Sequence, residues 1–523
     1  MESDLAELAE ESTKGGLILV SGTIISAIIS AIASILIARI LGPNDYGLYS
    51  LSLVIPQIFF LITDFGIKEG IIKFTIESRQ KNQIGLEIKI IKFALLIRAI
   101  AAIICFIFLF FASDLITAFL LNRNNLGFYM RIASVSVIFQ ALYSTVTFAY
   151  IGLDKVTSSS VITQIQSISK AIISVLFLIL GFGLVGAIYG YVFGFIFAGL
   201  IGTVSLLFHL KKIYYKPIKN ADVKPYLKLL IKYGTPLYFS TMLLGLMPQI
   251  IDVILSFFSS NYDIGNFKVT ANFIVLMTLV TKQITTSFLP AFTKLGQYNA
   301  EKSRNFFNLT LKFTTLLMIP ITTLLIIFSK DLIQLIYGIT YLDAGLYLSI
   351  YSLQFFFCAI GLLNLPSLFN GLGRTRETLK MNAVIFIIVI LFALIITNFF
   401  GILGLIFSII IGYGLGSFYG FFLAKRLIGV TINWKSTLKI FSSALLSAIG
   451  SIIILPDFSF IFFKLILGLL SYLFLYITLI PLTHTINKSE LKSINNFIKR
   501  NKILFVFKPI MLYQQKILKI WKN

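Results

Sequence analysis

Long apolar segments of about 20 residues recur along the whole chain, and they constrain its fold more than any other feature. About fourteen can be counted, and a helix of roughly 20 apolar residues crosses a bilayer core of about 30 Å. The sequence therefore predicts an all-α integral membrane protein with about 14 transmembrane helices. The expected spans are 17–39, 46–67, 90–112, 129–151, 160–181, 184–209, 234–258, 264–289, 307–328, 345–369, 379–398, 402–424, 437–455 and 460–482.

Few residues of the chain are charged, and most of the charged ones are basic. Charged residues make up 12% of the sequence, whereas a soluble domain carries roughly 25%. Yet 44 Lys and Arg stand against 21 Asp and Glu, which gives a net charge of +23. A nucleic-acid-binding protein would need a soluble basic domain, and no polar stretch here is long enough to form one. We therefore expect no nucleic-acid partner and interpret the basic residues as topology signals.

The positions of the basic residues predict the orientation in the membrane. Most of them fall in alternate loops and in the C-terminal tail, whereas the other loops hold only Arg39, Arg123 and Lys330. Cytoplasmic loops retain Lys and Arg, so we expect a multi-pass protein of the cell (cytoplasmic) membrane with both termini cytoplasmic. The acidic tail 1–16 lacks the features of a signal peptide and is expected to stay on the mature protein. The basic tail 483–523 is interleaved with aromatic residues, which predicts an amphipathic segment on anionic membrane lipids.

Short loop motifs recur at an offset of about 218 residues. Asp45-Tyr46-Gly47 returns as Asp263-Ile264-Gly265, and Gly183-Leu184-Val185-Gly186 returns as Gly401-Ile402-Leu403-Gly404. Each repeat holds six expected helices, an even number, so the two copies share one orientation in the membrane. The predicted domains are an N-terminal tail 1–16, an N-lobe 17–209, a cytoplasmic linker 210–233, a C-lobe 234–424, two extra helices in 437–482 and a basic cytoplasmic tail 483–523.

Several of these segments together resemble a known family. The segments ARILGPNDYGLYSLSL (38–53), LITDFGIKEGIIKF (61–74) and NGLGRTRETLKMN (370–382) resemble the O-antigen-type, lipid-linked oligosaccharide flippases of polysaccharide biosynthesis. These belong to the multidrug/oligosaccharidyl-lipid/polysaccharide (MOP) exporter superfamily. The resemblance implies two parallel six-helix lobes in a V around a central cavity, two extra C-terminal helices and alternating access. Segment 381–400 lacks the mid-helix Asn of many relatives, so no cavity contact is transferred there.

Two groups of polar residues within the expected spans are candidates for contact with a substrate. A charged side chain in the hydrocarbon costs roughly 2.5 to 3.5 kcal/mol, so each one needs a partner or water. Lys170 lies near the middle of span 160–181 with Thr163 and Gln166 on the same face, as a cavity wall or as an interhelical contact. Arg98 and Asp64 form either a structural ion pair or a second substrate-facing set.

Further candidates follow in the second repeat. Gln249 belongs to a polar stripe on span 234–258 and is a substrate-binding candidate. Asp252 and Lys268 fall at similar depth on adjacent helices, as a salt bridge or a gate, and Lys282 is a gate, ion-pair or interface candidate. Basic residues outnumber acidic ones within the spans, which favours a pyrophosphate or an acidic sugar as cargo.

The sequence contains none of the common catalytic or nucleotide-binding motifs. It has no GxxxxGK[ST], no HExxH, no nucleophile elbow and no Cys/His cluster, so we expect neither an enzyme nor a cofactor or metal. We predict a flippase that moves polyprenyl-linked oligosaccharide for surface polysaccharide or glycoprotein glycan assembly, with glycan-assembly enzymes as partners. One alternative is an ion-coupled drug or toxin exporter of the same fold. Another is an integral-membrane glycan polymerase or ligase, which would need larger external loops.

Overall fold

The computed structural model describes most of the chain. It covers residues 2–81, 83–213, 238, 242–243, 245–296, 300–454, 460–486 and 508–520. These residues form α-helices and short 3-10 turns with no β-strand among them, so the predicted all-α membrane class is confirmed. Most of the expected linker 210–233 and most of the basic tail lie outside the described residues. So does Thr241, which shares the expected polar stripe of span 234–258 with Gln249.

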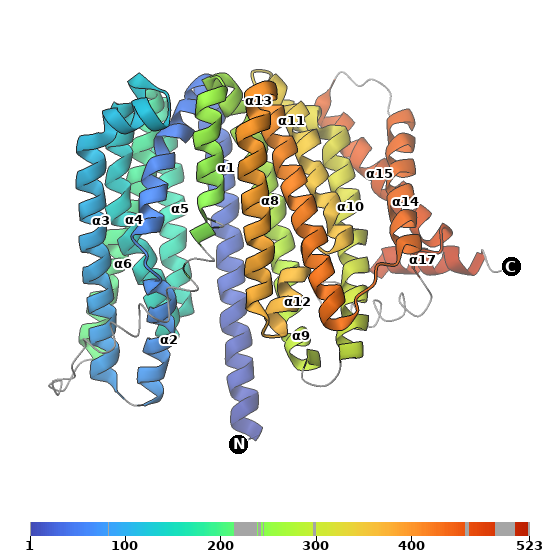
Figure 1. Cartoon of the computed structure of the whole chain (residues 1–523), viewed down its shortest axis with the longest axis horizontal. Helices are drawn as coiled ribbons and strands as arrows, with labels where there is room; N and C mark the ends of the chain where they lie inside the picture. Colours follow the sequence, from blue (N-terminus) through green and yellow to red (C-terminus); the bar gives the residue numbers. More distant parts are fainter. Residues whose placement is uncertain are drawn as a thin grey trace. The chain divides into compact units, whose positions relative to one another are not determined.

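The helices are long and many run alongside one another (Figure 1). The first half of the chain contains α1 (Glu2–Ile62), α2 (Ile67–Gln80), α3 (Ile84–Leu120), η1 (Asn124–Leu126), α4 (Gly127–Gly152), α5 (Val156–Ile179), α6 (Gly183–Ile213), an apolar helix Gly245–Phe258 and α8 (Asn261–Thr286). The second half contains α9 (Leu289–Gly296), α10 (Ala300–Tyr337), α11 (Leu342–Ser352), η2 (Leu353–Ile360), α12 (Leu365–Gly371), α13 (Thr375–Ile428), α14 (Trp434–Ile454), α15 (Ile461–Leu482) and α17 (Lys508–Ile520).

The membrane spans agree with the number expected from the sequence. Among the described residues, 11 helices are long and apolar enough to cross a membrane. Two of them, α1 and α13, each contain two expected spans, and Gly245–Phe258 is a further, shorter apolar helix, so about fourteen spans are present. The chain is therefore a multi-pass membrane protein.

The expected loops inside α1 and α13 are reduced to breaks at single glycines. Gly42 has a φ of 72° and Gly401 a φ of 54°, both in the left-handed region that glycine adopts without strain. Pro43 follows Gly42 directly, and proline suits the first turn of a helix because it lacks an N–H. Sequence reasoning placed a longer loop before residue 46 because it could not distinguish a one-residue break from a turn.

The chain divides into two compact units. Unit 1 comprises Met1–Asn272 with Ile390–Leu405, and unit 2 comprises Phe273–Val389 with Ile406–Asn523. Within unit 1, α4 packs against α3 and α6, and α6 also packs against α5 (Figure 1). Small residues let these helices approach closely, as at Gly202 of α6, where an added Cβ would lie 3.2 Å from Val146 of α4 and 3.3 Å from Ile162 of α5.

In unit 2, α15 is anchored on α10 by polar contacts at two levels. Lys464 Nζ lies 3.0 Å from Asp331 Oδ2, and Tyr476 donates a hydrogen bond of 2.9 Å to the carbonyl of Leu316. In Figure 1, α17 lies across α15, and the hydroxyls of its Tyr513 and of Thr478 are 3.1 Å apart. Thus α15 packs on α10 of the second repeat, and α17 packs on α15.

Glycine packing shows the internal repeat in three dimensions. A Cβ added at Gly152 would meet the side chain of Thr75 at 3.1 Å, and one added at Gly371 would meet the backbone nitrogen of Thr293 at 3.2 Å. Thr75 and Thr293 are themselves 218 residues apart. Repeat-related glycines therefore contact repeat-related helices, α2 in the first repeat and α9 in the second.

Candidate functional site

Lys170 is a cation without a counter-charge. It lies on α5, half-buried, with its Nζ 5.5 Å from the centroid of the Tyr191 ring. No carboxylate within the described parts of the chain comes within ion-pair distance of it. A cation–π contact of this kind stabilises an ammonium by about 0.5 to 2 kcal/mol, which does not replace an anion. Lys170 is therefore available to an anionic ligand.

Tyr191 links Lys170 to three glutamines. Its side chain, on α6, is buried, and its hydroxyl accepts hydrogen bonds from Gln57 Nε2 at 3.3 Å and from Gln140 Nε2 at 3.0 Å. Gln57 Oε1 in turn accepts a hydrogen bond of 2.8 Å from Gln249 Nε2. These five residues, which come from α1, α4, α5, α6 and the helix Gly245–Phe258, form what we name the Lys170 cluster.

The rest of the predicted stripe on α5 makes local and interhelical contacts. Thr163 Oγ1 donates a hydrogen bond of 3.0 Å to the carbonyl of Ser159, and Gln166 Oε1 accepts one of 3.4 Å from Ser167. Ser167 Oγ also accepts a hydrogen bond of 3.3 Å from Ser30 of α1. Of the stripe expected from the sequence, the structure brings only Lys170 to the glutamine network.

The second repeat shows that the fold does not need a lysine at this position. A Cβ at Gly194 would lie 3.1 Å from Cα of Lys170 and 3.1 Å from the Gln166 carbonyl oxygen. At Gly412, the repeat mate of Gly194, it would lie 3.2 Å from the nitrogen of Val389 and 3.3 Å from the Ile385 carbonyl oxygen. Val389 therefore occupies the place of Lys170 in an equivalent helix contact, and it is fully buried.

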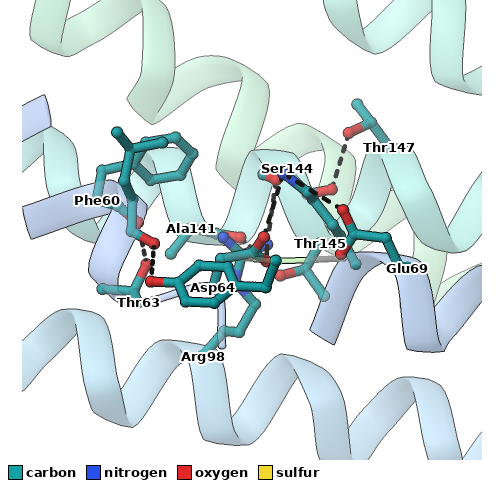
Figure 2. A network of polar contacts seen from close by, with 12 residues as sticks. Phe60, Thr63, Asp64, Glu69, Arg98, Ala141, Ser144, Thr145 and Thr147 are labelled. Carbon is teal, nitrogen blue, oxygen red and sulfur yellow. Dashed lines mark hydrogen bonds and ion pairs between the residues drawn. The ribbon is translucent and has the colours of Figure 1, made fainter. Parts of the chain in front are cut away.

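Arg98 stands in a charge-balanced group instead (Figure 2). Its guanidinium is fully buried, with one terminal nitrogen 3.4 Å from Asp64 Oδ1 and donating to Ser144 Oγ at 3.1 Å. Lys68 Nζ lies 3.2 Å from Asp64 Oδ2 and 3.8 Å from Glu69 Oε1. We name Asp64, Lys68, Glu69 and Arg98 the Arg98 cluster, in which two cations face two carboxylates.

Within the Arg98 cluster, Glu69 lies on α2, outside the membrane-spanning helices. Burial raises the pKa of its carboxyl, and the ammonium of Lys68 opposes this shift. The structure brings Arg98 and Asp64 together as a buried ion pair. Removing one partner of such a pair leaves an uncompensated charge that costs about 3 to 5 kcal/mol.

The other three predicted residues, Asp252, Lys268 and Lys282, differ in whether they have a partner of opposite charge. Lys268 of α8 donates a hydrogen bond to the buried Asp252 of the helix Gly245–Phe258, so these two form an ion pair. Lys282, further along α8, is exposed and has no carboxylate partner in the described parts of the chain. Among the described residues, no three His, Cys, Asp or Glu side chains gather as a metal site.

The two repeats touch through a reciprocal pair of glycines. A Cβ at Gly47 would lie 2.1 Å from the Asn261 carbonyl oxygen, and one at Gly265 would lie 2.0 Å from that of Pro43. Gly47 and Gly265 are 218 residues apart, as are Pro43 and Asn261. The contact is therefore symmetric in the sense of a two-fold interface, in which each side presents the same pair of residues.

Further hydrogen bonds join the two repeats around the contact of Gly47 and Gly265. Arg123 donates to Asn261 Oδ1 at 2.9 Å and to the carbonyls of Ser256 at 2.9 Å and Ser259 at 2.7 Å. Asn272 Nδ2 donates to Ser34 Oγ and to the Tyr46 hydroxyl, both at 3.0 Å. The loop that follows α3 and the middle of α1 are thus tied to the end of Gly245–Phe258 and to α8.

Sequence reasoning missed Gln57, Gln140 and Tyr191. They are uncharged and stand alone in apolar stretches, where a single polar residue is usual. The repeat offset could have singled out Tyr191 and Gln57, because the positions 218 residues later hold Ile409 and Val275.

A family and a fold can now be assigned. The model of the family described as polysaccharide biosynthesis protein matches residues 36–346. The chain belongs to this family. No curated protein matches the chain.

Solved structures with the same fold include membrane transporters and a flippase. The lipid II flippase MurJ, in an inward closed conformation, is 17% identical over 88% of this chain and 98% of that chain, with a TM-score of 0.71. An inward-facing multidrug resistance MATE family transporter of the MOP superfamily is 15% identical over 77% of this chain and 94% of that chain, with a TM-score of 0.66. A MOP superfamily transporter from Pyrococcus furiosus is 16% identical over 79% and 94%, with a TM-score of 0.55. The protein has the MOP fold, which confirms the expectation from the resemblance.

Proposed function

We propose that this protein is a flippase that translocates a polyprenyl-linked oligosaccharide across the cytoplasmic membrane by alternating access. Its membership of a polysaccharide biosynthesis family and its MOP fold support the proposal. MurJ, a structure with this fold, is described as a flippase of lipid II. The observation that carries the proposal is the uncompensated Lys170 beside the hydrogen-bonding cluster of Tyr191 and the three glutamines.

The chemistry of the Lys170 cluster suits the headgroup of such a lipid. An ammonium has three N–H donors and no acceptor, so an anionic oxygen is its natural partner. A pyrophosphate that joins polyprenol to a sugar would supply that oxygen, and charge-assisted hydrogen bonds strengthen away from bulk water. The amides of Gln57, Gln140 and Gln249 match the hydroxyl groups of a glycan. Gln166 and Thr163 would extend the wall of the binding cavity along α5.

The ion pairs would act in the conformational cycle rather than bind the lipid headgroup. In the Arg98 cluster and in the pair of Asp252 and Lys268, each cation already has a carboxylate. We assign to Asp64, Asp252 and Lys268 roles as gate or pairing residues, and to the exposed Lys282 a role at a gate or interface. Arg98, although paired, remains a second candidate for contact with the substrate.

The membrane context completes the proposal. With both termini cytoplasmic, α17 would lie at the inner leaflet, where its lysines favour anionic lipids. Its Gln514 Nε2 donates to the carbonyl of Ile477 at 3.5 Å, which holds the helix against α15. Enzymes of glycan assembly would supply the substrate on the cytoplasmic side and consume it on the other.

A direct test uses the purified full-length protein in vesicles with a fluorescently labelled polyprenyl-linked oligosaccharide. The proposal predicts protein-dependent loss of label from the inner leaflet, and a rate equal to that of protein-free vesicles would contradict it. In a deletion strain, glycan units should be stranded on the cytoplasmic side. A missing polymerase or ligase would instead leave single units outside.

An ion-coupled drug or toxin exporter is the second candidate, because a multidrug resistance MATE family transporter shares the fold. A cationic drug, however, would meet the like charge of Lys170, which costs free energy away from bulk water. Resistance assays distinguish the two: the flippase proposal predicts unchanged drug sensitivity in the deletion strain.

A further inference from the structure

The hydroxyl of Tyr191 has one hydrogen-bonding capacity that its neighbours do not use. A phenol oxygen accepts through its lone pairs and donates one proton. Gln57 and Gln140 both donate to this oxygen, at 3.3 and 3.0 Å. No acceptor among the residues that the structure describes receives the proton of Tyr191. A buried hydroxyl whose proton is unused is costly, so a partner for it is expected.

The two amides are themselves held so that their N–H ends face Tyr191. Gln57 Oε1 is engaged by Gln249 Nε2 at 2.8 Å, which leaves the nitrogen of Gln57 for Tyr191. Gln140 Nε2 also donates to Ser136 Oγ at 3.0 Å, and that hydroxyl donates its own proton to the carbonyl of Ala133 at 2.6 Å. The lone pairs of Tyr191 are therefore occupied by an oriented network, and its O–H must point elsewhere.

The ring of Tyr191 is fixed beside the free cation. Its centroid lies 5.5 Å from Lys170 Nζ, and it packs edge-on against Phe195 with centroids 5.1 Å apart. The second repeat holds Ile409, fully buried, at the equivalent place, so helix packing alone requires no hydroxyl. One residue pair thus combines an unpaired ammonium with an unused O–H donor.

We propose that Tyr191 is a second oxyanion donor: its O–H, together with the ammonium of Lys170, binds an oxygen of a phosphate-type anion. Gln57 and Gln140 are positioning residues that hold this proton toward the ligand. The inference rests on the proposed function, because the anion it takes is the pyrophosphate of the lipid-linked substrate.

The test measures binding of inorganic pyrophosphate to the purified full-length protein by calorimetry. Tyr191→Phe keeps the ring over Lys170 and removes only the O–H. We expect its Kd to rise roughly ten- to a hundredfold, the usual effect of removing a hydrogen bond to a charged group. Tyr189→Phe is the matched control on the same helix, since its ring packs among Phe177 and Phe193, and its Kd should equal that of the wild type.

The positioning role has a test of its own. Gln140→Met should weaken pyrophosphate binding, and the double variant with Tyr191→Phe should bind no more weakly than Tyr191→Phe alone, because the glutamine acts through the hydroxyl. Additive losses would contradict the positioning role. If Tyr191→Phe lowers the melting temperature, Gln140→Met and Gln57→Met carry the test in its place.

The outcomes separate this inference from the proposed function. If Tyr191→Phe binds pyrophosphate as the wild type does while Lys170→Val loses it, the role of Tyr191 is wrong and the anionic headgroup site stands. If Lys170→Val also binds as the wild type does, the headgroup site itself is wrong. Loss of binding in both variants, with Tyr189→Phe unchanged, supports both.

Discussion

The two repeats share their helix packing but not their polar residues. Gly194 packs on Lys170 in the first repeat, and Gly412 packs on Val389 in the second, each against backbone atoms of the neighbouring helix. Tyr191 has Ile409 as its counterpart. Where the backbone arrangement is the same and only one copy is polar, the polar residues are not there to hold the fold. The difference therefore supports the proposed functional role of Lys170 and Tyr191.

Charge balance separates two regions of the first repeat in the same way. The Arg98 cluster places two cations against two carboxylates, whereas Lys170 has no carboxylate near it among the described residues. Asp64 has Lys282 as its counterpart 218 residues later, so the balanced cluster is not repeated either. We expect substitutions in the Arg98 cluster to change stability and substitutions in the Lys170 cluster to change transport.

The largest expected effect is the loss of the buried Arg98 charge. Arg98→Leu leaves Asp64 and Glu69 with Lys68 alone and should lower the stability by about 3 to 5 kcal/mol, seen as a fall in the melting temperature of the purified protein. The double variant Arg98→Leu/Asp64→Asn should recover part of the loss. A melting temperature of Arg98→Leu equal to that of the wild type would remove the distinction between the two regions.

The reciprocal glycines Gly47 and Gly265 give a second prediction, at a contact where the two repeats are alike. Gly47→Val and Gly265→Val each force a side chain against a carbonyl that would lie about 2 Å away. Each should destabilise by about 1 to 3 kcal/mol, the usual cost of overpacking. Thermal unfolding of the two variants checks this, and equal losses are expected. A loss confined to one glycine would contradict a symmetric contact.

A smaller effect is expected in how the stability of the fold depends on pH through Glu69 of the Arg98 cluster. Burial raises the pKa of Glu69 in the folded state, so Glu69 destabilises the fold progressively as the pH rises from its unfolded pKa through its folded pKa. Glu69→Gln should remove this loss and be relatively more stable at neutral than at acidic pH. Melting temperatures of both proteins across pH 4 to 8 test the sign. A variant that loses stability relative to the wild type as the pH rises would show that the Lys68 interaction dominates.

The membrane fold could be predicted from the sequence because it depends on features that a single sequence displays. Apolar length specified the spans and a shared offset specified the repeat, whereas the orientation expected from the alternating basic loops stays a prediction. Single-glycine breaks at Gly42 and Gly401 could not be read, since nothing local distinguishes them from short loops. Lys170 was found because a charge in an apolar span is conspicuous, whereas Gln57, Gln140 and Tyr191 are brought together from three helices that are far apart in sequence.

We propose that Lys170 serves transport and not helix packing, and a single substitution at this position tests that role. Lys170→Val installs the residue that the second repeat uses at the equivalent contact, and Lys294→Val, at an exposed lysine of α9, is the matched control. In vesicles with labelled polyprenyl-linked oligosaccharide, we predict at least about tenfold slower flipping for Lys170→Val, with a melting temperature equal to or above that of the wild type. A folded Lys170→Val protein that flips at the wild-type rate would contradict the account.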